Sequence, residues 1–556
     1  MAWFGRGAVI TAVIVAASGV LAGCEAPPEE KTSASSSATP SPTLLPPPPS
    51  MAVPPPMVAP APAGRGVAAP SAAKVAMPQQ YQPDSDRFPD AAANGWMAAE
   101  DAPVSTFSLD VDTASYGFVR RNLREGHRPP AASVRVEEMV NYFPYNYAGP
   151  EKREEVLRAT ATVTPSPWKD GAKLLHIGLK GWDVARTARP RANLTFLIDV
   201  SGSMSGDDRL PLIQKALHQL GDGLRPDDKV AIVTYAGEAG VALPPTSAQE
   251  LPKIMAAVDG LRAGGSTAGA AGIKTAYEQA AQMFDPQAVN RVILATDGDF
   301  NVGTVDGKSL EAVIADKRRT GVYLSIVGVG AGNLNDALTQ RLAQAGNGQA
   351  AYLDSILEAR KIWIEQLGAS MVPLADDAKV QVEFNPAQVA EYRLVGYETR
   401  MLNRTDFAND RVDAGDLGSG HSVTAIYEFV PVGSKAVMTE PLRYGKHKAK
   451  AAAAGGTSTE YAFIKLRAKR PGEKNSFLTS WPVGRGNEVS TLAQAPDDLR
   501  FSVAVAGFAQ LLRGELPGEA KTWENTISLA DGARGADPHG WRAEAVQLMR
   551  AAQGLR

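Results

Sequence analysis

The chain has 556 residues, a formal net charge of −3 and a hydrophobic fraction of 44%, which are values of an ordinary soluble protein with two or three domains. Because basic residues are not in excess, the composition gives no support for nucleic acid as a partner or for charge-driven binding to an anionic membrane surface. The single cysteine excludes an internal disulfide, so the folded part must be stable without one.

Residues 1–24 have the features of an export signal. Arg6 precedes an apolar stretch from about Ala8 to Ala22, which is short for a membrane span. The stretch ends in Leu-Ala-Gly-Cys, which resembles the lipobox of bacterial lipoproteins and implies cleavage before Cys24 and lipidation of its thiol. An uncleaved anchor with a free thiol is the alternative. Because Glu25 follows the cysteine, the resemblance favours the outer membrane, facing the periplasm, over the inner membrane.

Residues 25–101 are predicted to be a disordered tether. Their sequence consists largely of Pro, Ala and Ser, which cannot bury enough apolar surface to fold and which favour extended conformations. Fully extended, such a tract would reach on the order of 200 Å. The folded body could therefore act far from its lipid anchor.

Residues 102–190 begin with a strand-like run and a predicted helix from Tyr116 to Arg124. The alternating runs VLRATATVTPSPW and KLLHIGLKGW then predict two half-buried strands. Asp110 and Asp112 suggest a metal site, but a strand followed by a capped turn explains them more simply. We expect this region to accompany the domain that follows it.

Residues 191–368 alternate between apolar strands and amphipathic helices. Strands that are apolar throughout and joined by helices predict an α/β fold with a doubly wound, mostly parallel sheet. Asp207 and Asp208 are predicted to begin the first helix. The predicted strands are LTFLIDV, KVAIVTY, RVILAT and YLSIVGVG, and the predicted helices are 209–220, 249–261, 268–283, 310–319, 336–345 and 356–367.

Residues 369–490 return to alternating strands, and residues 491–556 are predicted to be helical. The strands are KVQVEF, EYRLVGYE, SVTAIYEFV and YAFIKLRAK. Because strands lie on both sides of the α/β region, we expect that region to be inserted into, or packed against, a β-rich domain built from both flanks, with helices at the C-terminus.

Five oxygen-bearing side chains follow strand ends in the α/β region. Asp199, Ser201 and Ser203 follow the first strand, Thr267 lies in the loop RAGGSTAG, and Asp297 follows RVILAT. Loops at the carboxyl ends of parallel strands converge, so these side chains can meet in one crevice. Hydroxyl and carboxylate oxygens suit a hard divalent cation, Mg²⁺ or alternatively Mn²⁺ or Ca²⁺, with a position left for a carboxylate of another molecule. An ordinary strand, turn and helix start is the structural alternative.

The pattern Asp-x-Ser-x-Ser followed by Thr267 and Asp297 resembles the metal-ion-dependent adhesion site of von Willebrand factor type A (VWA) domains, over about residues 191–368. This resemblance implies that Asp199, Ser201, Ser203, Thr267 and Asp297 bind Mg²⁺, with Asp297 partly through water, and that the metal binds a protein ligand through an acidic residue. The chain from about Ser105 onward also resembles bacterial lipoproteins that pair a VWA domain with an N-terminal VWA-associated segment and a C-terminal domain of unknown function. That wider resemblance implies an architecture and no activity.

Sequence signals for an enzyme are weak. The six histidines are scattered without metal-ligand spacing, and no P-loop or nucleophile elbow is present. We therefore predict no enzymatic activity, but a lipid-anchored cell-envelope protein that mediates protein–protein interaction through bound Mg²⁺. Two alternatives remain: a structural or assembly factor of envelope complexes that acts through the β region, and a metal-assisted hydrolase.

Overall fold

The computed structural model describes most of the chain after residue 85. The described residues are 86–89, 92–109, 112–184, 189–265, 269–298, 307–366, 372–412, 414–440 and 459–555. The predicted export signal, Cys24, most of the predicted tether, Asp110 and Thr267 lie outside them. No helix among these residues is long and apolar enough to cross a membrane.

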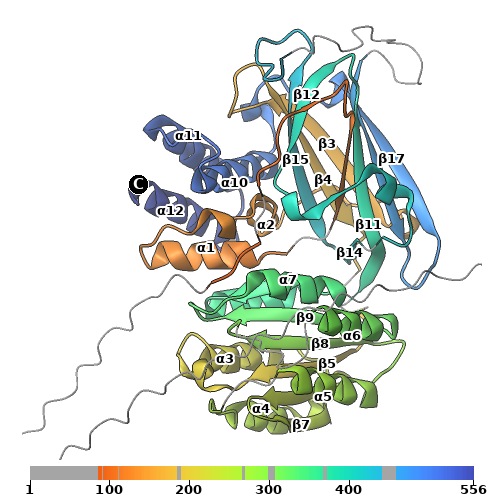
Figure 1. The fold of residues 1–556 in the computed structure, drawn as a ribbon, viewed down its shortest axis with the longest axis vertical. Helices are drawn as coiled ribbons and strands as arrows, with labels where there is room; N and C mark the ends of the chain where they lie inside the picture. Colours follow the sequence, from red (N-terminus) through yellow and green to blue (C-terminus); the bar gives the residue numbers. More distant parts are fainter. Residues whose placement is uncertain are drawn as a thin grey trace, which may run out of the picture. The chain divides into compact units, whose positions relative to one another are not determined.

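The α/β region forms a six-stranded sheet in the order β10-β9-β8-β5-β6-β7 (Figure 1). All neighbouring strands are parallel except the pair β6 and β7. This confirms the predicted doubly wound, mostly parallel sheet. The antiparallel β7 was not predicted, because its sequence AGVALPPTS contains two prolines, which strands tolerate mainly at a sheet edge. The strands are β5 (Ala192–Asp199), β6 (Lys229–Tyr235), β7 (Ala239–Ser247), β8 (Val289–Thr296), β9 (Val322–Val329) and β10 (Ala350–Leu353).

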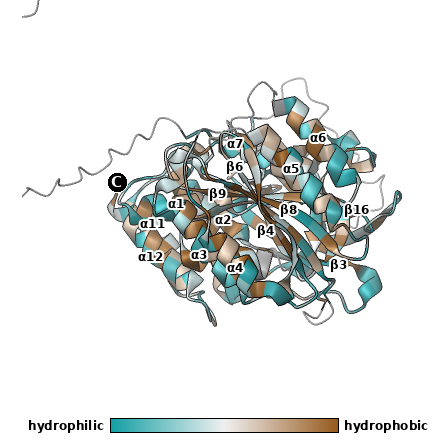
Figure 2. Ribbon diagram, turned by 90° about the horizontal axis from the view of Figure 1, so that it is seen from below, coloured by the Kyte–Doolittle hydropathy of each residue, from teal (hydrophilic) through white to brown (hydrophobic). Residues whose placement is uncertain are grey.

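Helices cover both faces of this sheet because successive residues of each strand point to opposite sides. On β5, Phe196 belongs to the core cluster shared with α3, α4 and α8, whereas Leu197 belongs to the cluster shared with α5, α6 and α7. Figure 2 shows the central strands of this sheet as strongly hydrophobic. The helices are α3 (Leu210–Gly221), α4 (Leu251–Asp259), α5 (Gly269–Gln282), α6 (Gly307–Arg319), α7 (Asp336–Ala345) and α8 (Ile356–Arg360), the last continued by a π-helical turn (Lys361–Gln366).

The flanking regions together build two antiparallel sheets around one core. Their orders are β1-β12-β15-β4-β3 and β13-β2-β11-β16-β17, with β14 paired to β11. Both sheets combine strands from before and after the α/β region, so that region is inserted between the two halves of a β domain, as expected. The strands are β1 (Met97–Ala98), β2 (Val104–Ser108), β3 (Leu157–Pro165), β4 (Lys173–Gly181), β11 (Pro373–Phe384), β12 (Val389–Val395), β13 (Met401–Leu402), β14 (Gly415–Gly418), β15 (Ser422–Pro431), β16 (Glu460–Lys469) and β17 (Ser476–Gly484).

A helical layer also combines the two flanks. Residues such as Tyr116, Val140, Phe501, Trp523 and Met549 share one hydrophobic core, although they come from both ends of the described chain. The predicted helices at the C-terminus are confirmed by α10, α11 and α12. The helices are α1 (Ala114–Arg124), α2 (Val136–Asn141), α10 (Asp497–Arg513), α11 (Ala520–Asp531) and α12 (Trp541–Gly554).

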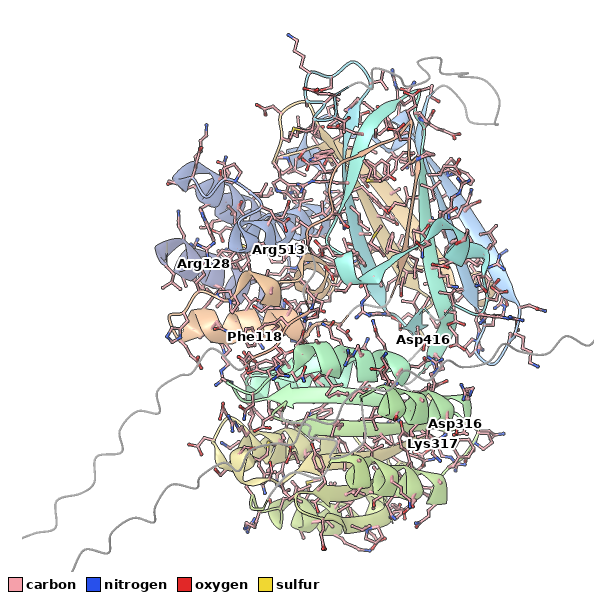
Figure 3. All side chains as sticks on the ribbon, in the orientation of Figure 1. Phe118, Arg128, Asp316, Lys317, Asp416 and Arg513 are labelled. Atoms are coloured by element: carbon pink, nitrogen blue, oxygen red, sulfur yellow. The ribbon has the colours of Figure 1, made fainter. Side chains whose placement is uncertain are left out.

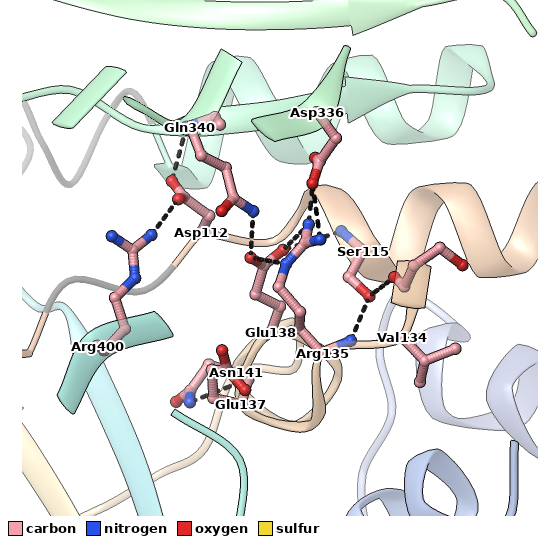
Figure 4. A network of polar contacts seen from close by, with 12 residues as sticks. Asp112, Ser115, Val134, Arg135, Glu137, Glu138, Asn141, Asp336, Gln340 and Arg400 are labelled. Atoms are coloured by element: carbon pink, nitrogen blue, oxygen red, sulfur yellow. Dashed lines mark hydrogen bonds and ion pairs between the residues drawn. The ribbon is translucent and has the colours of Figure 1, made fainter. Parts of the chain in front are cut away.

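A buried polar network joins the helical layer to the α/β domain (Figure 4). The Arg135 guanidinium lies 2.7 Å from the Asp336 carboxylate, and the Gln340 amide donates to Glu138 at 3.0 Å. Asp112 accepts a hydrogen bond from the backbone of Ala350 at 2.7 Å and pairs with Arg400 at 2.6 Å. The prediction of a capped turn at Asp112 was therefore wrong: this carboxylate is buried in an ion pair between distant segments.

The predicted tether ends earlier than residue 101. Arg87 exchanges backbone hydrogen bonds with Leu334 and Asp336 at 2.8 and 3.0 Å, and the Phe88 ring packs edge-on against Phe118 of α1, labelled in Figure 3. Farther along, β1 pairs with β12. Phe88 and Trp96 each offer a large apolar surface to bury. The Pro, Ala and Ser residues earlier in the tract have only small side chains and offer much less.

Candidate functional site

The first loop of the candidate site is fixed by hydrogen bonds to Asp199. This residue ends β5 and its side chain is fully buried. Its Oδ1 accepts from the backbone N–H of Ser201 at 2.8 Å, and its Oδ2 accepts from the hydroxyl of Tyr235, at the end of β6, at 3.1 Å. The carboxylate is therefore held by its own loop and by the neighbouring strand end.

The two serine hydroxyls lie next to each other in this loop. Ser201 is buried and Ser203 is half-buried, and their Oγ atoms are 3.0 Å apart. Adjacent ligands of an octahedral Mg²⁺ ion with bonds of about 2.1 Å are separated by about 3.0 Å, the square root of two times the bond length. The two hydroxyls form a hydrogen bond across this distance, which also fits neighbouring positions around such an ion. Ser203 lies in a short 3₁₀ turn (Gly202–Ser205).

The second carboxylate follows β8 in a tightly constrained loop. Asp297 is 1% exposed, and the next residue, Gly298, has a φ of +98°. A Cβ at Gly298 would lie 2.4 Å from the backbone oxygen of Asn333, so no other residue fits without a backbone shift. The Asp297 loop is thus packed directly against residues 333–335.

The third loop contacts the first through its backbone. Gly264 donates to the carbonyl of Val200 at 2.7 Å, and Gly202 donates to the carbonyl of Gly265 at 3.0 Å. Thr267, the predicted ligand in this loop, lies outside the described residues. The last described residue of this loop, Gly265, contacts Gly202 between the two serines and lies two positions before Thr267.

The carboxylates of Asp199 and Asp297 act on each other electrostatically. Burial raises the pKa of Asp199 above its usual range, hydrogen bonds from Ser201 lower it, the charge of Asp297 raises it, and the hydrogen bond from Tyr235 lowers it. Two buried like charges are costly unless a cation compensates them. The donor set, two carboxylates and two hydroxyls, therefore fits a hard divalent cation. The described residues contain no group of three or more His, Cys, Asp or Glu side chains that could hold a metal.

Arg209 is a charged neighbour that the sequence analysis missed. Its Nη1 lies 3.2 Å from Oδ2 of Asp297 and 2.5 Å from the backbone oxygen of Ser203, and its Nη2 donates to Ala331 at 2.8 Å. The only sequence signal was a basic residue shortly after the Asp-x-Ser-x-Ser pattern. Its partners come from segments about ninety and one hundred and twenty positions away, which a local pattern does not show.

The prediction that Asp207 and Asp208 begin the first helix was wrong. Helix α3 begins at Leu210 with Arg209 as its N-cap residue, and no side chain caps it. Asp208 pairs instead with Arg121 of α1 at 2.9 Å. This ion pair connects the helical layer to the loop that carries the serines.

Family comparisons divide the chain into three matched parts. Residues 82–176 match the family described as von Willebrand factor, residues 193–361 match the von Willebrand factor type A domain, and residues 369–555 match the family described as Uncharacterized protein YfbK, C-terminal. The second of these contains all five predicted metal ligands. The α/β domain is therefore a VWA domain.

The chain is also similar to individual proteins and solved structures. A UPF0353 protein of Mycolicibacterium vanbaalenii is 29% identical over 251 residues, which is 38% of this chain and 74% of that protein. A solved von Willebrand factor type A structure from Catenulispora acidiphila covers 71% of this chain and 89% of its own, with 15% identity and a TM-score of 0.38. The Escherichia coli (strain K12) protein named "Uncharacterized protein YfbK" is 42% identical over 459 residues, which is 82% of this chain and 78% of that protein. This chain belongs to the YfbK family.

Proposed function

We propose that this protein is anchored to the cell envelope by a lipid on Cys24, binds Mg²⁺ at the candidate site, and uses the bound metal to hold an acidic residue of a partner protein. The observation that carries the proposal is the 3.0 Å spacing of the Ser201 and Ser203 hydroxyls beside the buried carboxylates of Asp199 and Asp297. Bound Mg²⁺ would supply an electrophilic centre there. Thr267 is proposed as a further ligand from the family resemblance.

Binding fits the described groups around the site better than catalysis does. The Tyr235 hydroxyl donates to Asp199, and Arg209 pairs with Asp297, so each of these titratable groups holds a proposed ligand. A metal-assisted hydrolase would in addition require a general base directed at a metal-bound water. We therefore propose a protein–protein interaction role and assign no catalytic residue.

Lipid anchoring is proposed from the lipobox resemblance alone. Cys24→Ser should abolish processing and move the protein from the membrane fraction to the soluble fraction. Mass analysis of the mature N-terminus provides the direct test. An unmodified Cys24 in the wild-type protein would refute the anchor, and retention of the full signal would support the uncleaved alternative.

The interaction role is tested by crosslinking in native envelopes with and without a chelator. Asp199→Ala should remove the same crosslinked partner that the chelator removes, and Mg²⁺ should restore it only in the wild type. Asp227→Ala is a matched control, because this exposed aspartate precedes β6 at the opposite end of the sheet. Partner capture that is equal in Asp199→Ala and in the wild type would instead favour an assembly role for the β domain.

A further inference from the structure

Arg209 is held rigidly beside the candidate metal ligands. Its guanidinium contacts Asp297, the carbonyl of Ser203 and the carbonyl of Ala331, which come from three different loops. A Cβ at Gly330 would lie 2.4 Å from the Arg209 Nε, so the side chain lies directly on that backbone. The Arg209 side chain is 19% exposed, and the Asp297 side chain with which it pairs is 1% exposed. The positive charge is thus a fixed part of the site.

This charge changes the electrostatic balance of the site. Asp199 and Asp297 bring two negative charges, and Arg209 reduces their sum to one. Of the two acidic residues that precede Arg209 in the loop, Asp208 is paired with Arg121 and Asp207 is exposed. With a divalent cation added, these three described side chains would leave a net positive charge of one, and without Arg209 their sum would be zero. In a largely buried site such a difference is only weakly screened.

We propose that Arg209 is a specificity-determining residue, which lowers the affinity of the site for the metal itself and raises the affinity of the metal-bound site for an anionic ligand over a neutral one. This inference rests on the proposed metal site. It assigns to Arg209 a preference for an acidic partner that the carboxylates of Asp199 and Asp297 alone do not explain, because their two negative charges neutralise a divalent cation.

The alternative role for Arg209 is purely structural. A guanidinium that only orients Asp297 would strengthen metal binding, because the carboxylate would be pre-positioned, and its removal would weaken that binding. The two roles therefore predict opposite signs for the effect of Arg209→Gln on metal affinity. Arg209→Lys separates charge from geometry, because lysine keeps the charge but cannot reproduce the three guanidinium contacts.

Two titrations of the full chain test the inference. The first adds Mn²⁺ and monitors its binding by electron paramagnetic resonance. The second adds acetate at saturating Mn²⁺ and monitors its binding by the broadening of the acetate NMR signal. Arg209→Gln should bind Mn²⁺ more tightly and acetate more weakly, each on the order of tenfold, the size expected for one unit charge in a partly buried site. Arg209→Lys should stay close to the wild type in both titrations. Acetamide, the neutral analogue, should bind equally to all three proteins.

Several outcomes would overturn the inference. Weaker Mn²⁺ binding by Arg209→Gln, or no change in either titration, would show that the charge does not set the preference. If Arg209→Gln fails to fold, Asp207→Lys serves as the second variant, because it adds positive charge at an exposed neighbour. This variant should bind Mn²⁺ more weakly and acetate more tightly than the wild type. Changes of the opposite sign would refute the inference. Failure of the wild type to bind Mn²⁺ would refute the proposed metal site, whereas normal wild-type binding with an unchanged Arg209→Gln would refute only the role of Arg209.

Discussion

Replacement of Arg135 by methionine should strongly destabilise the protein, because it leaves two carboxylates buried without their cation. Arg135 is 5% exposed, and its partners Asp336 and Glu138 are each 2% exposed. The guanidinium lies 2.7 Å from Asp336 and donates to Glu138 at 3.1 Å. Removing one member of a buried ion pair costs about 3–5 kcal/mol, and here one cation serves two anions, so we expect the upper part of that range.

The pH dependence of this penalty gives the sharper test. Burial raises the pKa of Asp336 to about 6 even with Arg135 present, and Arg135 lowers it. Without Arg135 the pKa in the folded variant rises further above its unfolded value, so the variant takes up a proton on folding. Lowering the pH from 7.5 to 5.5 should therefore reduce the difference in unfolding free energy between variant and wild type.

Denaturant unfolding of both proteins at several pH values measures this difference. Arg158→Met is the control, because its pair with Glu151 is exposed, at 40% and 76% of the two side chains, and such pairs contribute about 0–1 kcal/mol. Asp336→Asn combined with Arg135→Met should recover part of the stability. A penalty below about 1 kcal/mol, or one that grows as the pH falls, would refute the reasoning.

Three further predictions concern the core, the site loop and the N-terminal segment. Burial lowers the pKa of His176 to about 4, so between pH 6.5 and 4 the unfolded chain binds a proton that the folded protein does not. Over this range the unfolding free energy of the wild type should fall by about 3 kcal/mol relative to that of His176→Gln. Parallel denaturations of the two proteins measure this, and a difference that stays constant with pH would contradict it. Gly298→Ala should weaken Mg²⁺ binding in calorimetric titrations and lower the melting temperature, because its Cβ would lie 2.4 Å from a backbone oxygen, whereas Gly264→Ala, with nothing within 4 Å, should not. Phe88→Ala should accelerate hydrogen exchange at Asp336 and Ala337, whose N–H groups donate to the carbonyl of the neighbouring Arg87, and unchanged exchange there would refute the contact.

Much of the VWA domain is predictable from sequence because its strands are unusually uniform. All residues of β5 and β8 are buried and most are apolar, and the ends of these strands mark the loops that carry Asp199 and Asp297. The topology of a parallel sheet then brings those loops together. The insertion into a β domain could also be inferred, since strand-like runs stand on both sides of the α/β pattern.

Features that depend on contacts between distant segments were not predictable. Asp112 reads as a turn residue because its partner Arg400 lies far along the chain, and the two meet only in the folded core. Phe88 looks like part of a tether until the ring of Phe118 is beside it. Arg209 likewise acquires its role only from the carbonyl of Ala331 and from Asp297, which the fold brings to it.

A crystal structure of the protein soaked in Mn²⁺, with anomalous diffraction, would show whether the serine loop holds a divalent cation. We expect one strong anomalous peak about 2.1–2.2 Å from the Oγ atoms of both Ser201 and Ser203, with those two oxygens still about 3.0 Å apart. An absent peak at saturating Mn²⁺, or a peak outside the loops that carry Asp199 and Asp297, would contradict the account.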